Sequence, residues 1–295
     1  NTRKVFSRRY VAGQGWAPAV VVPGLSTETP SVVLVTGQLL MDATGNATWV
    51  RHNFETRRYS AAAGWSATAF VPAAGVGGLV DAKVDAGGNV HLLGYGGGEL
   101  RVTRLPSGGT TWEAWADPAL SALATPSARL ALDSSGGAIA VWRERNPGDG
   151  NYSMKANRRV NGAWQTPVRI EEVLTDVTVS PPEIEIAANG NAIAAWHQGS
   201  SLYVNRFNAA TASWGVATEV DAGQVTSNLL ARIEMAMLAD GRAVLTWQSG
   251  TYALKSMSYS PSTGFSAPLA VTSLSTGNHF LGIDRDGRAL LTYRS

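Results

Sequence analysis

The stretch AANGNAIAAWHQ, Ala187 to Gln198, places an Asn-Gly turn between two short apolar segments. The residues beyond the turn alternate with the period of two that is typical of a β-strand. Asn-Gly is a common sequence in tight hairpin turns, because glycine readily adopts the positive φ that such turns need. We therefore predict a β-hairpin with Gly190 in its turn.

The same pattern recurs six times, and one glycine sets the register of each copy. The copies are MDATGNATWV at Gly45, VDAGGNVHLL at Gly88, LDSSGGAIAVW at Gly136, IAANGNAIAAW at Gly190, MLADGRAVLTW at Gly241 and IDRDGRALLTY at Gly287. Steps of 43, 48, 54, 51 and 46 residues separate them, which is the period of a four-stranded propeller blade. A helical repeat is excluded because the flanks alternate with period two.

A second signal, an aromatic residue after a turn, lies between these copies. It occurs at Trp16, Trp65, Trp112, Trp164, Trp214 and Phe265, and an arginine precedes five of these residues, at Arg9, Arg58, Arg104, Arg159 and Arg206. The chain opens with the second signal and closes with the first. We therefore predict a single all-β domain over residues 1–295, a six-bladed β-propeller of four-stranded blades whose N- and C-terminal strands pair to close the ring.

The fourth copy predicts the strands of one blade. The inner strand is expected over about Glu183 to Ala187 and the second strand over Ala192 to His197. A third strand follows over about Leu202 to Phe207, and an outer strand starts near Trp214. The glycine turns then share one face of the disc with the turns before each tryptophan, and the loops after each second strand lie on the opposite face.

These motifs resemble two groups of proteins, the secreted bacterial propellers of the sialidase-like group and the six-bladed fucose-binding lectins. MDATGNATW is similar to a sialidase-type aspartate box, and the Gly-Trp turns resemble the blade ends of the lectins. The resemblance implies a propeller over the whole chain. It also implies a glycan as the ligand, which in the lectins is held between blades by an arginine, a glutamate and an aromatic residue.

Composition narrows the class of protein. The net charge is only +2, and the basic residues form no block of the kind seen in nucleic-acid-binding arms, so we expect no nucleic-acid partner. The chain has no cysteine, which excludes disulfides and Cys-based zinc sites. No apolar run reaches the roughly 18 residues that span a bilayer. The start without methionine and the low lysine content favour an exported protein, at the cell surface, in the periplasm or secreted.

The inner strands supply the first group of candidate binding residues. Seven positions before each repeat glycine stand Gln38, Asp81, Arg129, Glu183, Glu234 and Phe280. Together with Arg232, this column is a candidate ligand site at the mouth of the central channel. Its carboxylates are candidate general acids or bases for a glycan, or ligands for a bound calcium ion, although we expect no cofactor. The alternative is a solvated channel whose charges pair across the ring, as Arg129 would with Glu183 or Asp81.

The loops after the second strands supply the second group of candidate residues. His52, Arg143, His197 and Gln198 are suited to hydroxyl-rich or anionic ligands through hydrogen bonds, with aromatic residues nearby for stacking. The tryptophans at the strand ends, Trp142, Trp196 and Trp247, are expected to pack between blades instead. DRDG at Asp284 to Gly287 is expected to be a hairpin turn rather than a calcium loop.

Regular repetition without an irregular catalytic cluster favours a non-catalytic binding or scaffold module that recognises a carbohydrate or a protein surface. One alternative is a glycan-active hydrolase or lyase that uses Asp81, Glu183 or Glu234, with Arg129 or Arg232 holding an acidic sugar. Another is a structural subunit of a surface assembly.

Overall fold

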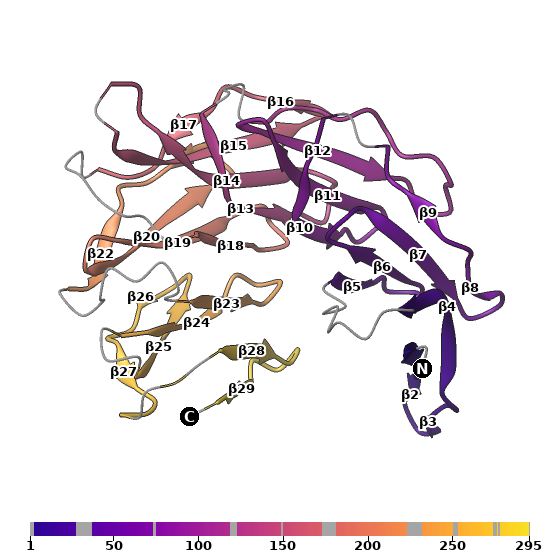
Figure 1. Cartoon of the computed structure of the whole chain (residues 1–295). Coiled ribbons are helices and arrows are strands. Elements are labelled where there is room, and N and C mark those ends of the chain that lie inside the picture. The colour runs from indigo at the N-terminus through magenta and orange to yellow at the C-terminus, as the bar shows by residue number, and fades with distance from the viewer. Residues whose placement is uncertain are drawn as a thin grey trace.

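Figure 1 shows the chain as a computed structural model. The structure describes residues 3–27, 37–72, 75–118, 123–148, 150–172, 181–222, 232–249, 253–273, 276 and 278–294. These residues form only β-strands, turns and irregular segments, without a helix. The described part of the chain is therefore all-β, as predicted.

Antiparallel pairing groups the middle of the chain into five sheets, each named here after its first strand. The β5 sheet contains β5 (Gly37–Met41), β6 (Ala47–Arg51), β7 (Glu55–Ser60), β8 (Gly64–Trp65) and β9 (Ala69–Phe70). The β10 sheet contains β10 (Gly78–Val84), β11 (Val90–Gly96) and β12 (Glu99–Leu105). The β13 sheet contains β13 (Ala124–Leu132), β14 (Ala138–Arg145), β15 (Tyr152–Val160), β16 (Ala163–Trp164) and β17 (Val168–Arg169).

The remaining two sheets follow the same plan. The β18 sheet contains β18 (Glu183–Ile186), β19 (Ala192–Gln198), β20 (Ser201–Asn208), β21 (Ser213–Trp214) and β22 (Thr218–Asp221). The β23 sheet contains β23 (Ile233–Met237), β24 (Ala243–Gln248), β25 (Leu254–Ser260), β26 (Gly264–Phe265) and β27 (Leu269–Ala270). The strands predicted for the fourth repeat agree with β18 to β21 to within about two residues at their ends.

The two ends of the chain form smaller units. Strands β1 (Arg3–Ser7) and β4 (Val20–Thr27) pair with each other, as do β2 (Tyr10–Val11) and β3 (Gly15–Trp16), and β28 (His279–Ile283) pairs with β29 (Ala289–Tyr293). The first strands contact one another in the order β5, β10, β13, β18, β23 and β28 along the inner side of an arc (Figure 1). Among the described residues, no ladder joins the N-terminal strands to β28 or β29, so the predicted closing pair is not formed in this structure.

The repeat glycines occupy the turns that the sequence predicts. All six lie in the left-handed region, with φ from 80° at Gly88 to 89° at Gly287. In each turn the glycine N–H donates to the carbonyl of the residue three positions earlier, as Gly190 does to Ala187 at 2.9 Å. An L-residue with a side chain adopts this conformation at a cost, which explains why glycine marks the repeat.

The hydrophobic core lies between the faces of neighbouring sheets. One cluster joins Ile139 and Met154 of the β13 sheet to Ile184 and Trp196 of the β18 sheet, and similar clusters lie at three other junctions. The second-strand tryptophans Trp142, Trp196 and Trp247 are fully buried, as predicted. Packing between sheets therefore holds the arc together. The described part of the chain has no helix of the length and apolar character needed to cross a membrane.

Candidate functional site

Charged side chains follow the innermost strands and pair across neighbouring sheets. The Arg129 Nε lies 3.2 Å from the Glu183 Oε1, and the Lys83 Nζ lies 3.7 Å from the Glu185 Oε1. These pairs link β10 and β13 to β18. From the sequence we expected Arg129 to pair with Glu183 or Asp81 across the ring, and the structure confirms an ion pair between Arg129 and Glu183.

Burial perturbs two acids of the inner strands, Glu183 and Glu185. Burial raises the pKa of Glu183 to about 7, although the guanidinium of Arg129 acts in the opposite direction. Burial also raises the pKa of Glu185. Burial alone would lower the pKa of Lys83, but the carboxylates of Asp81 and Glu185 outweigh it and raise that pKa. A carboxyl group that titrates near neutrality is suited to proton transfer, so Glu183 remains a candidate acid or base.

The other members of the column lie in different environments. Asp81 is buried, and its Oδ2 accepts a hydrogen bond from the Leu130 N–H at 2.9 Å, which ties β10 to β13. Glu234 pairs with Arg232, whose guanidinium also lies 5.0 Å from the ring centre of Phe280. Gln38 is half-buried on β5, opposite Val50. Asp81 thus has a structural contact, whereas Glu183, Glu234 and Arg232 form a charged group on the inner side of β18 and β23.

The candidate residues after the second strands differ in how far they are buried. His52 is exposed and covers Gly78, and Arg143 is half-buried with its guanidinium 4.3 Å from the ring centre of Tyr152. His197 and Gln198 were expected to face a ligand where the second strand meets its loop, but they end strand β19 and are buried. Burial lowers the pKa of His197 to about 4. Gln198 lies in the strand because β19 continues one residue beyond its predicted end, and every residue of β19, including His197, is buried.

A cavity of about 370 Å³ lies where the β18 sheet meets the β23 sheet. Its walls come from the glycine turns and from the turns before the outer-strand aromatics, so it opens on the opposite face from His52 and Arg143. We call it the junction pocket and define it by Asn191, Arg206, Trp214, Gly215, Asp240 and Tyr259. It combines aromatic surface with amide, guanidinium and carboxylate groups.

Arg206 connects the two walls of the junction pocket. Its Nη1 donates a hydrogen bond to the Tyr259 hydroxyl at 3.0 Å, and its guanidinium carbon lies 5.7 Å from the centre of that ring. Behind it, the Asn205 side chain is buried and donates to the carbonyls of Gly215 and Ile170, at 3.0 and 2.8 Å. Among the described residues, the Asn205 Oδ1 has no hydrogen-bond partner. The pocket thus offers the forked donors of Arg206 beside an aromatic wall.

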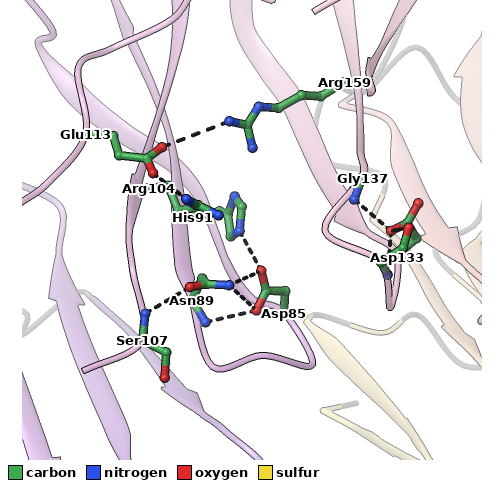
Figure 2. A network of polar contacts seen from close by, with 10 residues as sticks. Asp85, Asn89, His91, Arg104, Ser107, Glu113, Asp133, Gly137 and Arg159 are labelled. Carbon is green, nitrogen blue, oxygen red and sulfur yellow. Dashed lines mark hydrogen bonds and ion pairs between the residues drawn. The ribbon is translucent and has the colours of Figure 1, made fainter. Parts of the chain in front are cut away.

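The junction between the β10 and β13 sheets shows how the same place is filled elsewhere (Figure 2). There, Arg104 holds the position of Arg206, and its Nε donates to the Glu113 Oε1 at 2.8 Å. Glu113 also lies 4.0 Å from Arg159. The Glu113 N–H donates to the Arg104 carbonyl as the Gly215 N–H donates to that of Arg206, so Gly215 is the counterpart of Glu113. A carboxylate occupies one junction, whereas a glycine leaves the other open.

The aspartates of the glycine turns satisfy backbone donors. Asp85 accepts from Asn89 and lies 3.0 Å from the His91 Nε2 (Figure 2). Asp284 accepts from the N–H groups of Asp286 and Arg288, so DRDG forms the predicted hairpin turn. Among the described residues, no group of three or more His, Asp or Glu side chains is arranged to hold a metal ion. Calcium binding by the inner-strand carboxylates therefore stays a prediction.

Sequence reasoning missed the junction pocket, although two of its residues carried a signal. Arg206 and Trp214 belong to the repeated arginine and aromatic columns, which we used above only to define the repeat. Strand pairing also corrects one member of the arginine column, which is Arg158 and not Arg159. Arg158 lies opposite Ile139, as Arg206 lies opposite Ile193. Arg158 lies 5.2 Å from the ring centre of Phe207 in the next sheet, as Arg206 lies over Tyr259. The absence of a carboxylate at Gly215 could have been noted only after the columns were aligned.

No protein-family model and no curated protein matches the sequence of this chain. Similar solved structures include the BP39L lectin of Burkholderia pseudomallei, with a TM-score of 0.64 and 12% identity over 99% of this chain and 92% of that one. The Aleuria aurantia lectin, solved with Fucalpha1-6GlcNAc, has a TM-score of 0.53 and 10% identity over 88% of each chain. An ulvan lyase bound to -[GlcA(1-4)Rha3S]- has a TM-score of 0.54 and 10% identity over 82% of this chain and 72% of that one. At these identities the likeness shows the fold alone, which is of the propeller type.

Proposed function

We propose that this protein is a non-catalytic carbohydrate-binding propeller and that the junction pocket is its binding site. The observation that carries the proposal is the open junction at Gly215, where Arg206 faces a cavity instead of a carboxylate. Sugars are commonly recognised by planar hydrogen-bonding groups together with an aromatic surface for their apolar faces. Arg206, Asn191 and Trp214 supply these groups on one cavity wall.

We also propose that the scaffold is a ring of six blades closed by its two ends. The lectin structures of similar fold support a binding role for such a scaffold, although their ligands do not define the ligand of this chain. A protein surface with exposed sugars or carboxylates is the alternative partner of the same pocket.

The test is a glycan-array screen of the wild-type chain beside two variants at one position. A Cβ at Gly215 would lie 3.5 Å from the Asn205 Oδ1 and 3.6 Å from the Arg206 carbonyl, which is ordinary contact, and φ at this residue is not in the left-handed region. Gly215→Glu is therefore expected to fold and to pair with Arg206 as Glu113 pairs with Arg104. We expect it to lose at least tenfold in affinity, whereas Gly215→Ala stays within about threefold of wild type.

Other outcomes of the same screen would overturn the proposal in different ways. Binding retained by Gly215→Glu but lost in Glu183→Gln or Glu234→Gln would move the site to the inner strands. No binding by wild type to any glycan, with intact folding by circular dichroism, would contradict the carbohydrate reading and leave a protein partner.

A second candidate function is turnover of an acidic glycan at the inner strands. The observation in its favour is Glu183, whose pKa of about 7 is suited to a general acid or base beside the cationic Arg129. Wild type incubated with uronate-containing polysaccharides should then produce new chain ends, and Glu183→Gln should lose at least a hundredfold in rate. Equal chain-end release by wild type and Glu183→Gln would contradict this candidate.

A further inference from the structure

We propose that strand β29 pairs with β1 and β2 of the same chain, with Ala289 directly opposite Tyr10. The N-terminal strands would then be the third and outer strands of the sheet that β28 and β29 begin. Among the described residues this hairpin has no third strand, and the N-terminal strands have no first or second strand.

The register follows from a column that four complete sheets share. In each of them the second strand begins with an alanine, and this alanine lies opposite one residue of the third strand. That third-strand residue lies opposite the aromatic residue of the outer strand, so the three residues form a column across the sheet. The columns are Ala47, Tyr59 and Trp65; Ala138, Arg159 and Trp164; Ala192, Phe207 and Trp214; and Ala243, Tyr259 and Phe265.

The two ends of the chain contain the separate halves of one such column. Ala289 begins β29 and lies opposite Ile283, as Ala192 lies opposite Ile186. At the other end, Tyr10 lies opposite Trp16. Joining Ala289 to Tyr10 completes the column, and it places Leu290 opposite Arg9 and Thr292 opposite Ser7.

The N-terminal strands already lie beside the β5 sheet, where the proposal needs them. In the complete sheets the outer-strand aromatic covers the third strand of the preceding sheet, as Phe265 packs on the cluster that contains Val204. Trp65 does the same to the N-terminal strands, because its Nε1 donates to the Ser7 Oγ at 2.8 Å. Ser7 therefore occupies the third-strand position of the sheet that precedes the β5 sheet around the arc. The two-stranded sheet of β28 and β29 is the one that lacks a third strand.

Apolar residues on both sides of the opening lack the cover that their counterparts have. Leu290 is 72% exposed, whereas its counterpart Ile193 is 2% exposed. Leu39 on the facing strand β5 is 62% exposed, against 8% for its counterpart Met235. Figure 1 shows β28 and β29 on one side of the arc's opening and the N-terminal strands on the other. Burying this apolar surface favours closure, and strands of the same chain meet at a higher effective concentration than strands of two copies.

The test uses the absence of native cysteine, which allows one defined disulfide to be introduced into the full chain. The pair Thr292→Cys with Ser7→Cys joins the proposed partners. The matched control is Thr246→Cys with Ser256→Cys, because Thr246 and Ser256 lie opposite each other in the same columns of the β23 sheet. The register control is Thr292→Cys with Val5→Cys, which is offset by two residues on the same face.

We expect the Thr292 and Ser7 pair to oxidise in the monomer as completely as the matched control, and at least tenfold faster than the register control. Faster oxidation of the offset pair would overturn the register. Disulfide-linked dimers that form in place of the monomeric product would show that a second copy supplies the strand. Hydrogen exchange on the wild-type chain gives an independent measurement. Pairing protects the β29 amides that point away from β28, whereas an open edge leaves those amides fast.

Discussion

At two ionisable residues, Glu183 and His197, burial outweighs the charge of a neighbouring side chain. Glu183 lies 3.2 Å from Arg129, yet burial still raises its pKa. His197 lies near the carboxylate of Asp221, yet burial lowers its pKa to about 4. Both groups therefore prefer to be neutral in the folded protein, and each links folding to pH in a direction that can be measured.

Glu183 is expected to make the protein less stable as the pH rises. Its pKa is 4.5 in an unfolded chain and about 7 in the folded one, so between these values the folded state holds a proton that unfolding releases. The free energy of unfolding therefore falls across this window, by at most roughly 3 kcal/mol from this group. Urea unfolding at pH 5 and pH 8 should show a smaller fall for Glu183→Gln than for wild type. An equal fall in both proteins would show that Glu183 ionises normally.

His197 should act in the opposite direction at acidic pH. Its folded pKa lies below the unfolded value of 6.5, so the unfolded state binds the proton first and stability falls as the pH drops from about 6.5 towards 4. The loss is at most roughly 3 kcal/mol. His197→Gln should lose less stability than wild type between pH 7 and pH 4.5, as measured by urea unfolding. The same loss in both proteins would assign the acid sensitivity to other groups.

At the scale of the elements, each sheet depends on a turn that only some residues tolerate. Gly136 has a φ of 84°, and a Cβ placed there would meet no atom within 4 Å, so backbone strain is the whole cost of a side chain. Gly136→Ala should lower the free energy of unfolding by about 1 to 2 kcal/mol. Gly136→Asn should lose less, because asparagine enters the left-handed region more readily. Equal stability of wild type and the alanine variant in urea would contradict the role of this turn.

The strands were predictable from the sequence because the repeat supplies six examples of one hairpin. Glycine, alternating apolar residues and an aromatic are local signals, and local signals locate β18 to β21 closely. The burial of His197 and Gln198 was not predictable in this way, since it depends on how far β19 extends beneath its neighbours. The junction pocket depends on the contact between two sheets, and only the aligned strand pairs reveal that Gly215 is the counterpart of Glu113.

At the scale of the whole molecule, closing the ring would create a second junction of the open kind. Arg9 is the counterpart of Arg206. Its side chain lies near Gly45, and the counterparts Arg206 and Gly241 both line the junction pocket. Tyr59 is the counterpart of Tyr259, and Ala17 stands where Gly215 does, because its N–H donates to the Arg9 carbonyl. The missing wall would be supplied by Ala289 and Leu290 once β29 pairs with the N-terminal strands.

We therefore expect two ligand sites in the closed ring, one at Arg206 and one at Arg9. With a glycan identified on the array, titration calorimetry should give about two sites for wild type and about one each for Gly215→Glu and Ala17→Glu. The double variant should lose binding, since a glutamate would then pair with the arginine at both junctions, as Glu113 does with Arg104. A single site in wild type that Ala17→Glu leaves unchanged and Gly215→Glu removes would restrict binding to the junction pocket. The difference between the two junctions would then lie in their residues, because Leu290 differs from Ile193 in shape and Arg8 stands where Asn205 does. The number of sites thus shows whether the junction formed by ring closure binds the ligand as the junction pocket does, or shares only its strand pairing.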